Sequence, residues 1–179
     1  MAGQTVTCID RSWDYNFHLM WQKVFHAGNY WAVNSVAEVV GGVIQQVGRN
    51  NFNSVAKLKI FGHGWPGNQR VGGGQSTPIQ LAQVIGIDGQ TGSLKNQAYL
   101  ALLKPYLQRD GVVQLHGCRV AEGPLGKSLL FALANLWDCR VQAAFETQYP
   151  DIFEDDFEGN YYEYDGGAGY PKGTTYLNS

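Results

Sequence analysis

The sequence predicts an α/β domain built on a mainly parallel sheet with helices on both faces. Short hydrophobic segments rich in β-branched residues alternate with segments whose apolar residues recur every three or four positions. This alternation is typical of parallel strands joined by right-handed helical crossovers. A chain of 179 residues with 44% hydrophobic content is long enough for one domain with a sizeable core.

The first part of the chain begins with a predicted strand and continues into a predicted helix. The strand is expected over residues 5–10, which are β-rich and precede a polar turn. Residues 11–31 contain many aromatic side chains, which we interpret as a segment packed over the sheet, with a substrate-groove wall as the alternative. The helix is expected over residues 34–47, where valine and isoleucine recur at helical spacing and Asn34 or Ser35 can cap the start.

The middle of the chain contains two hydrophobic strands that each end in glycine. The first is predicted over residues 57–62, and residues 69–71 are expected to form one side of a small hairpin. A short helix is expected within residues 77–92, and the clearest helical pattern covers residues 93–108. The second hydrophobic strand is predicted over residues 111–116.

The C-terminal part changes character after a last helix and strand. A helix is expected over residues 124–137 and a strand over residues 140–144. Acidic residues then gather, and residues 161–164 alternate like an edge strand. We therefore expect the whole chain to form one domain, with its core at about 4–146 and an acidic loop plus a C-terminal edge strand at 147–179.

Composition and charge argue against several classes of function. The net charge is −2, the pI is near 6.0, and the basic residues are scattered, so we expect no nucleic-acid partner. No apolar run approaches the roughly 20 residues that span a bilayer, so we expect no membrane partner. The first residues do not resemble a signal peptide, which predicts a cytoplasmic protein as synthesised, with signal-independent export left open. The oligomeric state is not predicted.

The three cysteines fit a reduced protein with a thiol available for chemistry. Cys8, Cys118 and Cys139 are odd in number, and their spacing matches neither a disulfide framework nor a zinc site. We therefore expect no cofactor and no metal. His116 can in principle join His63 and Cys118 in a metal site, but the sequence offers no fourth ligand; local packing or hydrogen bonding is the preferred interpretation.

His63 and Cys118 are the candidate catalytic residues, because each follows one of the two glycine-ended hydrophobic strands. Ligands of open parallel sheets bind beyond the carboxyl ends of the strands, so neighbouring strands would bring the imidazole and the thiol together there. A nearby imidazole activates a thiolate nucleophile or protonates its leaving group. The backbone N–H groups of Gly64 and Cys118 are the candidate donors to a developing oxyanion.

These motifs resemble the clan of cysteine peptidases that contains caspases, gingipains, legumains and separases. The chain most resembles bacterial gingipain-like domains of unknown function over roughly residues 55–170. The resemblance rests on Phe61-Gly62-His63-Gly64-Trp65-Pro66-Gly67, Val71-Gly72, Leu115-His116-Gly117-Cys118-Arg119-Val120-Ala121, Gly126 and Val141-Gln142-Ala143-Ala144. It implies a three-layer caspase-like fold and a peptidase that uses a His63–Cys118 dyad, with Cys118 following His63 by 118 − 63 = 55 residues.

Departures from the caspases argue against cleavage after aspartate. A glycine replaces the caspase-type serine before His63, His-Gly-Cys-Arg-Val replaces Gln-Ala-Cys-Arg-Gly, the chain is short, and it contains no obvious interdomain cleavage linker. We instead favour cleavage after arginine or lysine, because carboxylates are available to bind a basic side chain. The candidate substrate-binding residues are Asp10, Trp65, Arg119, Asp151 and Asp155, with Glu154 and Asp156 in the same acidic loop.

Two other functions remain alternatives at the level of sequence. One is a caspase-like binding or assembly module that has kept the fold and lost turnover. The other is a toxin-like thiol hydrolase that acts on a non-peptide bond. For the acidic residues, the alternative to substrate binding is a solvated loop. The chain contains no Gly-x-Ser-x-Gly elbow and no phosphate-binding loop, so a serine hydrolase and a nucleotide-binding enzyme are not expected.

Overall fold

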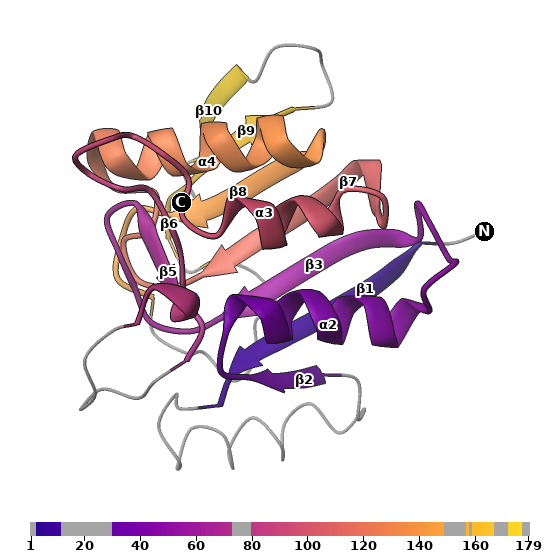
Figure 1. Cartoon of the computed structure of the whole chain (residues 1–179). Coiled ribbons are helices and arrows are strands. Elements are labelled where there is room, and N and C mark those ends of the chain that lie inside the picture. The colour runs from indigo at the N-terminus through magenta and orange to yellow at the C-terminus, as the bar shows by residue number, and fades with distance from the viewer. Residues whose placement is uncertain are drawn as a thin grey trace.

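The computed structural model contains a seven-stranded central sheet with the strand order β10-β9-β8-β7-β3-β1-β2 (Figure 1). The structure describes residues 3–11, 30–72, 80–148, 157, 159–166 and 172–176. The strands are β1 (Gln4–Asp10), β2 (Tyr30–Val33), β3 (Val55–Phe61), β7 (Leu107–His116), β8 (Arg140–Ala144), β9 (Tyr161–Asp165) and β10 (Lys172–Tyr176). In this sheet the pairings β2–β1, β1–β3, β3–β7 and β7–β8 are parallel, whereas the pairings β8–β9 and β9–β10 are antiparallel. The predicted α/β class with a mainly parallel sheet is confirmed.

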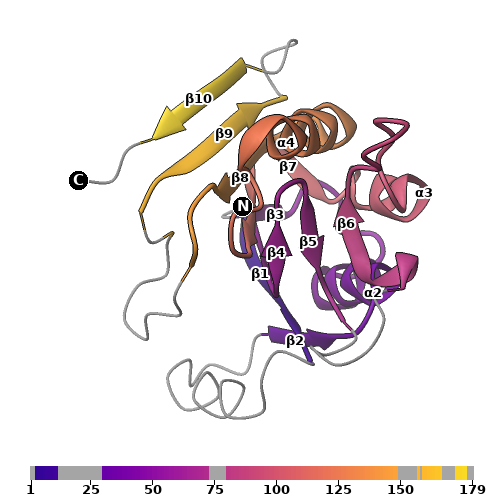
Figure 2. The same cartoon turned by 90° about the vertical axis from the view of Figure 1, so that its left-hand side faces the viewer.

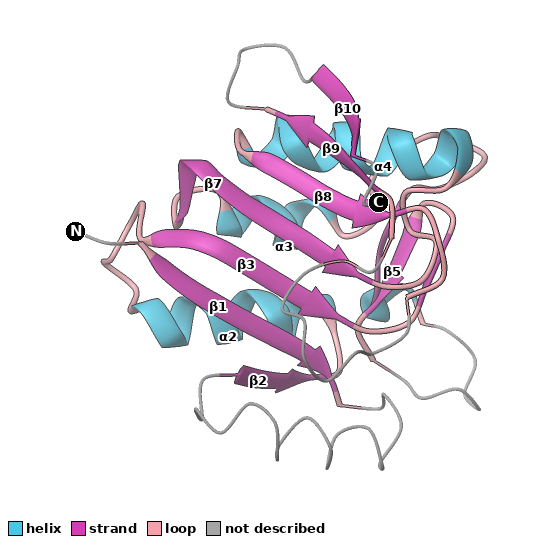
Figure 3. Ribbon diagram, turned by 180° about the vertical axis from the view of Figure 1, so that it is seen from behind, coloured by secondary structure: helices cyan, strands magenta, loops and turns pink. Residues whose placement is uncertain are grey.

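The described helices lie against one face of this sheet, as the front and rear views show (Figures 1 and 3). They are α2 (Val36–Val47), α3 (Gln97–Leu100), α4 (Gly123–Trp137) and the 3-10 turns η1 (Leu81–Gln83) and η2 (Ala101–Leu103). Ser35 caps α2 by accepting a hydrogen bond from Glu38 N, as the sequence predicted. The expected helices on the second face are not found among the described residues. None of the described helices has the length and apolar character needed to cross a bilayer.

The two faces of the sheet differ in chemistry. Apolar side chains with no exposed surface pack under the helices: Leu58, Ile60, Val113, Leu115, Val141 and Ala143. The opposite face carries a buried polar row, formed by Lys59, Gln114, Gln142 and Glu163 on four adjacent strands. Gln114 donates to Gln142 across 2.9 Å, and Gln142 donates to Glu163 across 2.6 Å. A one-residue slip of any of these strands would break the row, so it helps to fix the register.

A second, three-stranded antiparallel sheet lies beside the carboxyl ends of β1 and β3 (Figure 2). Its strands are β4 (Gly64–Trp65), β5 (Asn68–Arg70) and β6 (Val84–Gly86). Pro66 and Gly67 form the turn between β4 and β5, and Gly67 takes a φ of +74°, which favours glycine. The small hairpin predicted around residues 69–71 is therefore confirmed, and it begins directly after His63.

Several predicted elements are corrected by the structure. The helix expected over 93–108 is reduced to α3 and η2, because Asn96 adopts a left-handed φ of +56° before them and β7 already begins at Leu107. The helix expected within 77–92 consists of η1 followed by strand β6. Residues 161–164 belong to β9, which is not an edge strand because β10 pairs outside it.

Candidate active site

The strands that deliver His63 and Cys118 are neighbours in the central sheet. β3 and β7 pair in parallel, with Phe61 opposite His116 at the end of the ladder. His63 and Cys118 each lie two residues beyond this pair, so both leave the sheet at the same edge and the same level. Gly62 N donates to His116 O across 3.4 Å and continues the pairing past the last ladder residues. The predicted adjacency of the two strands is thus confirmed.

The two loops touch through their glycines. A methyl group at Gly64 would lie 2.7 Å from Cys118 O and 2.9 Å from Gly117 C, closer than real Cβ atoms approach. A methyl group at Gly117 would lie 3.0 Å from Gly64 Cα. Glycine is therefore required at position 64, because any side chain there would push the His63 loop and the Cys118 loop apart, whereas a side chain at position 117 would require smaller shifts of the Gly64 backbone.

Backbone hydrogen bonds hold the loop after Cys118 from both sides. On one side, Gly67 N in the β4–β5 turn donates to Val120 O across 2.9 Å. On the other, Arg119 N donates to Glu146 O and Ala121 N donates to Ala144 O, both across 2.9 Å. Arg119 adopts a φ of +58°, which is uncommon for a residue with a side chain. The backbone around Cys118 is thus a fixed turn between the hairpin and the end of β8.

The three cysteines have different environments. Burial raises the pKa of the Cys8 and Cys139 thiols to about 12, so both are inert core thiols near neutral pH. Cys118 is only partly buried, and its Sγ donates to Gln148 O across 3.4 Å. Of the three, Cys118 is the thiol that solvent and a reagent can reach.

His116 is a structural residue, as the sequence interpretation preferred. Its ring stacks between Phe61 and Phe157, with ring centroids 4.2 and 4.6 Å away, and its Nε2 lies 3.3 Å from Gln114 Oε1. Burial lowers the pKa of His116 to about 3, and the charge of Lys59 contributes to the decrease. Within the described residues, no three His, Cys, Asp or Glu side chains gather closely enough to hold a metal ion.

The candidate substrate-binding residues occupy different positions around this edge. Asp10 is fully buried at the end of β1, and its Cβ would lie 3.2 Å from a methyl group at Gly62. Trp65 is half-buried in β4. Arg119 is exposed and forms a bidentate ion pair with Glu122, with N–O distances of 2.6 and 2.9 Å. Asp151 and Asp155, like their neighbours Glu154 and Asp156, lie outside the described residues.

Two residues that contact this site were not predicted from the sequence. Gln69 is fully buried beside both loops, and Gln148 supplies the carbonyl that accepts from Cys118. The contact of Gln69 could have been predicted from the sequence, because the two-residue Pro66-Gly67 turn places it opposite Gly64. The contact of Gln148 could not, since it depends on how the chain folds back after β8.

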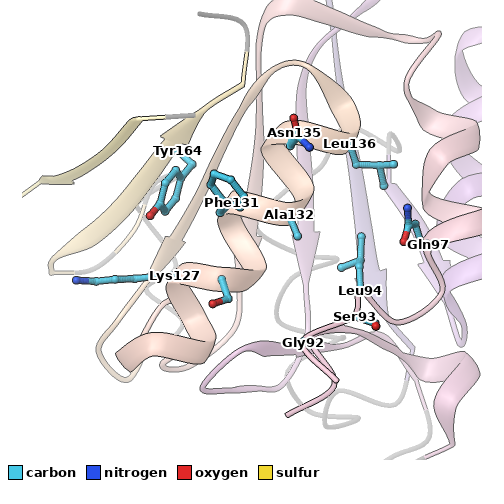
Figure 4. Close-up of a pocket in the computed structure, with 11 residues that line it drawn as sticks. Gly92, Ser93, Leu94, Gln97, Lys127, Phe131, Ala132, Asn135, Leu136 and Tyr164 are labelled. Atoms are coloured by element: carbon cyan, nitrogen blue, oxygen red, sulfur yellow. The ribbon is translucent and has the colours of Figure 1, made fainter. Parts of the chain in front are cut away.

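A groove of about 590 Å³ lies elsewhere, between α4 and the segment that precedes α3 (Figure 4). Phe131 and Tyr164 line it in an edge-to-face pair, with ring centroids 5.7 Å apart. Ser93 and Gln97 line the opposite side. None of the predicted site residues that the structure describes lines this groove, so it is separate from the His63–Cys118 edge.

Comparison with known proteins places the chain in one family. A search of curated proteins and a search of solved structures each gave no match. The family described as Domain of unknown function (DUF4347) matches residues 32–148, a stretch that includes β3, β7, His63 and Cys118. Because this match covers more than half of the 179 residues, the chain belongs to the DUF4347 family.

Proposed function

We propose that the protein is a cysteine peptidase of the caspase-like clan, with His63 and Cys118 as its catalytic dyad and a three-layer caspase-like architecture. The observation that carries the proposal is the pairing of Phe61 with His116. His63 and Cys118 each follow this pair by two residues, so both leave the sheet at the same edge and the same level. The direct contact between the Gly64 and Gly117 backbones supports it further. The motifs around both residues are those that resemble the clan.

In this mechanism His63 removes the proton from the Cys118 thiol, and the thiolate attacks the scissile carbonyl carbon. The hydrogen bond from Cys118 Sγ to Gln148 O must break as the proton moves to His63. The imidazolium of His63 then protonates the departing amine, and water hydrolyses the thioester to regenerate the thiol. Apart from the water and the backbone N–H groups that bind the oxyanion, each step uses only the side chains of the dyad and the bound peptide.

The backbone N–H groups of Gly64 and Cys118 stabilise the oxyanion in this mechanism. Arg70 N donates to His63 O across 2.7 Å, which makes His63 and Arg70 a hydrogen-bonded pair of the β4–β5 ladder. Because such pairs alternate along an antiparallel ladder, the next pair, Gly64 and Gln69, directs its N–H groups away from the other strand. The Gly64 N–H therefore remains available for a ligand outside the hairpin.

The substrate class that we propose is a peptide with arginine or lysine before the cleaved bond. The acidic stretch that contains Asp151 and Asp155 lies close in sequence to Gln148, whose carbonyl contacts Cys118. A carboxylate beside the thiol would bind a basic side chain and reject an acidic one.

The test uses acyloxymethyl ketone probes whose peptide ends in arginine, lysine or aspartate. We expect the arginine and lysine probes to label the full chain at Cys118, with labelling lost in Cys118→Ala and His63→Ala. Cys139→Ala is the matched control and should label like the wild type. Absence of labelling by all three probes would contradict the proposal and favour a binding module. Labelling without cleavage of any member of a peptide library would instead favour hydrolysis of a non-peptide bond.

A further inference from the structure

Gln69 occupies the space between the two loops of the proposed dyad. It lies on β5, opposite Gly64, and its side chain is fully buried. A methyl group at Gly117 would collide with Gln69 Oε1, and one at Gly62 would lie 3.0 Å from Gln69 Nε2. The two ends of a single amide therefore contact the residue before His63 and the residue before Cys118.

Hydrogen bonding defines the orientation of this amide. Gln69 Nε2 donates to Arg70 O across 3.2 Å, which directs Oε1 toward Gly117. Within the described part of the chain, the buried Oε1 has no hydrogen-bond partner. A buried carbonyl without a partner destabilises the folded state. Hydrogen bonding of this amide is therefore incomplete, and the feature that relates Gln69 to both loops is the space that its side chain fills.

We propose that Gln69 is a positioning residue that sets the separation and orientation of His63 and Cys118. The inference rests on the proposed function, because it assumes that the two side chains react together. On one side the loops meet at Gly64 and Gly117, and on the other side Gln69 fills the space between Gly62 and Gly117. A catalytic pair must be held within about half an ångström of its working geometry, and a buried spacer supplies that constraint.

The experiment measures alkylation of Cys118 by iodoacetamide at pH 6 and pH 8.5, with modification located by peptide mapping. Imidazole activation makes a thiol reactive below the usual range of a free cysteine, so the ratio of the two rates reports the pairing. We expect His63→Ala to lower the ratio of the pH 6 rate to the pH 8.5 rate by about tenfold or more, and Gln69→Ala to lower it by a similar factor. Gln69→Met keeps the length of the side chain, and its ratio should stay within about threefold of the wild type.

The controls separate positioning from general destabilisation. Gln142→Met removes another buried glutamine of the same fold, one that bonds Gln114 and Glu163, and should leave the ratio unchanged. Circular dichroism and thermal unfolding check each variant, and Gln69→Asn, one methylene shorter, replaces Gln69→Ala if that variant does not fold. A wild-type ratio in the shortened variant, or a ratio in Gln69→Met as low as in that variant, overturns the spacer role. An unchanged ratio in His63→Ala overturns the proposed dyad itself.

Discussion

In strands β3 and β7, the body of each strand and its carboxyl end differ in how they contact the rest of the protein. In the body, side chains such as Ile60 and Leu115 are fully buried under the helices. At the ends, the chain places glycines around His63 and Cys118, and the two backbones contact each other directly. The body supplies stability through side-chain burial, and at the ends the absence of side chains at Gly64 and Gly117 lets the two backbones approach each other.

The largest expected effect is on catalysis at the ends. Cys118→Ala and His63→Ala should each lower kcat/KM on a cleaved peptide by about a thousandfold or more, since each removes one half of the proposed dyad. The free energy of unfolding should change by only about 1 kcal/mol or less, because neither side chain belongs to the apolar core. Steady-state kinetics and urea unfolding of the same preparations check both parts. If either variant lost stability in proportion to its loss of activity, the strand ends would also contribute to stability, and the distinction between the ends and the body would be wrong.

The reverse pattern is expected in the body. Leu115→Ala removes a fully buried side chain three residues before Cys118 and should lower the free energy of unfolding by about 2–5 kcal/mol. Activity per folded molecule should stay near the wild type, because the strand ends keep their backbone contacts. Leu125→Ala, at an exposed position on α4, is the control and should change stability little. A collapse of activity in well-folded Leu115→Ala would show that packing and chemistry are not separable.

His116 lies at the boundary between the two regions and gives the smallest effect. Its pKa is lowered to about 3 in the folded protein, against about 6.5 for a free histidine. As pH falls below 6.5 the unfolded chain binds a proton that the folded protein does not, so stability falls. This linkage predicts a loss of about 2 kcal/mol between pH 7 and pH 5.

His116→Phe should remove that loss, because phenylalanine keeps the stack with Phe61 and Phe157 and does not titrate. Urea unfolding at pH 7 and pH 5 measures the difference between the wild type and the variant. If the free energy of unfolding depended on pH equally in the two proteins, His116 would bind its proton in the folded protein as it does in the unfolded chain, which would contradict the prediction.

The comparison also explains what the sequence could predict. The bodies of α2, α4, β3 and β7 follow from local hydrophobic periodicity, and the predictions there are confirmed within a few residues. The adjacency of the loops at His63 and Cys118 could be predicted because carboxyl ends of neighbouring parallel strands lie at the same edge of the sheet. In contrast, β2 and β10 were not predicted, although β8 and β9 are equally short, because neither segment was interpreted as a strand from its own pattern.

The errors have local causes that periodicity does not reveal. Residues 93–108 have a helical pattern, yet Asn96 takes a left-handed conformation and Leu107 pairs with Val55. Contacts such as Gln69 between two glycines, or Phe157 on His116, join residues far apart in the chain. The candidate dyad of His63 and Cys118 could therefore be proposed from sequence, whereas the contacts of Gln69 and Phe157 required the structure.

Disulfide trapping tests most directly whether positions 63 and 118 face each other. Two cysteines form a disulfide without strain only when their Cα atoms lie within about 7 Å and their side chains converge. We predict that His63→Cys, after mild oxidation, forms a disulfide with Cys118 that mass spectrometry detects as a linked peptide. Gln97→Cys, on the separate groove, should form no link to Cys118. Two free thiols at positions 63 and 118 after the same oxidation would contradict the account.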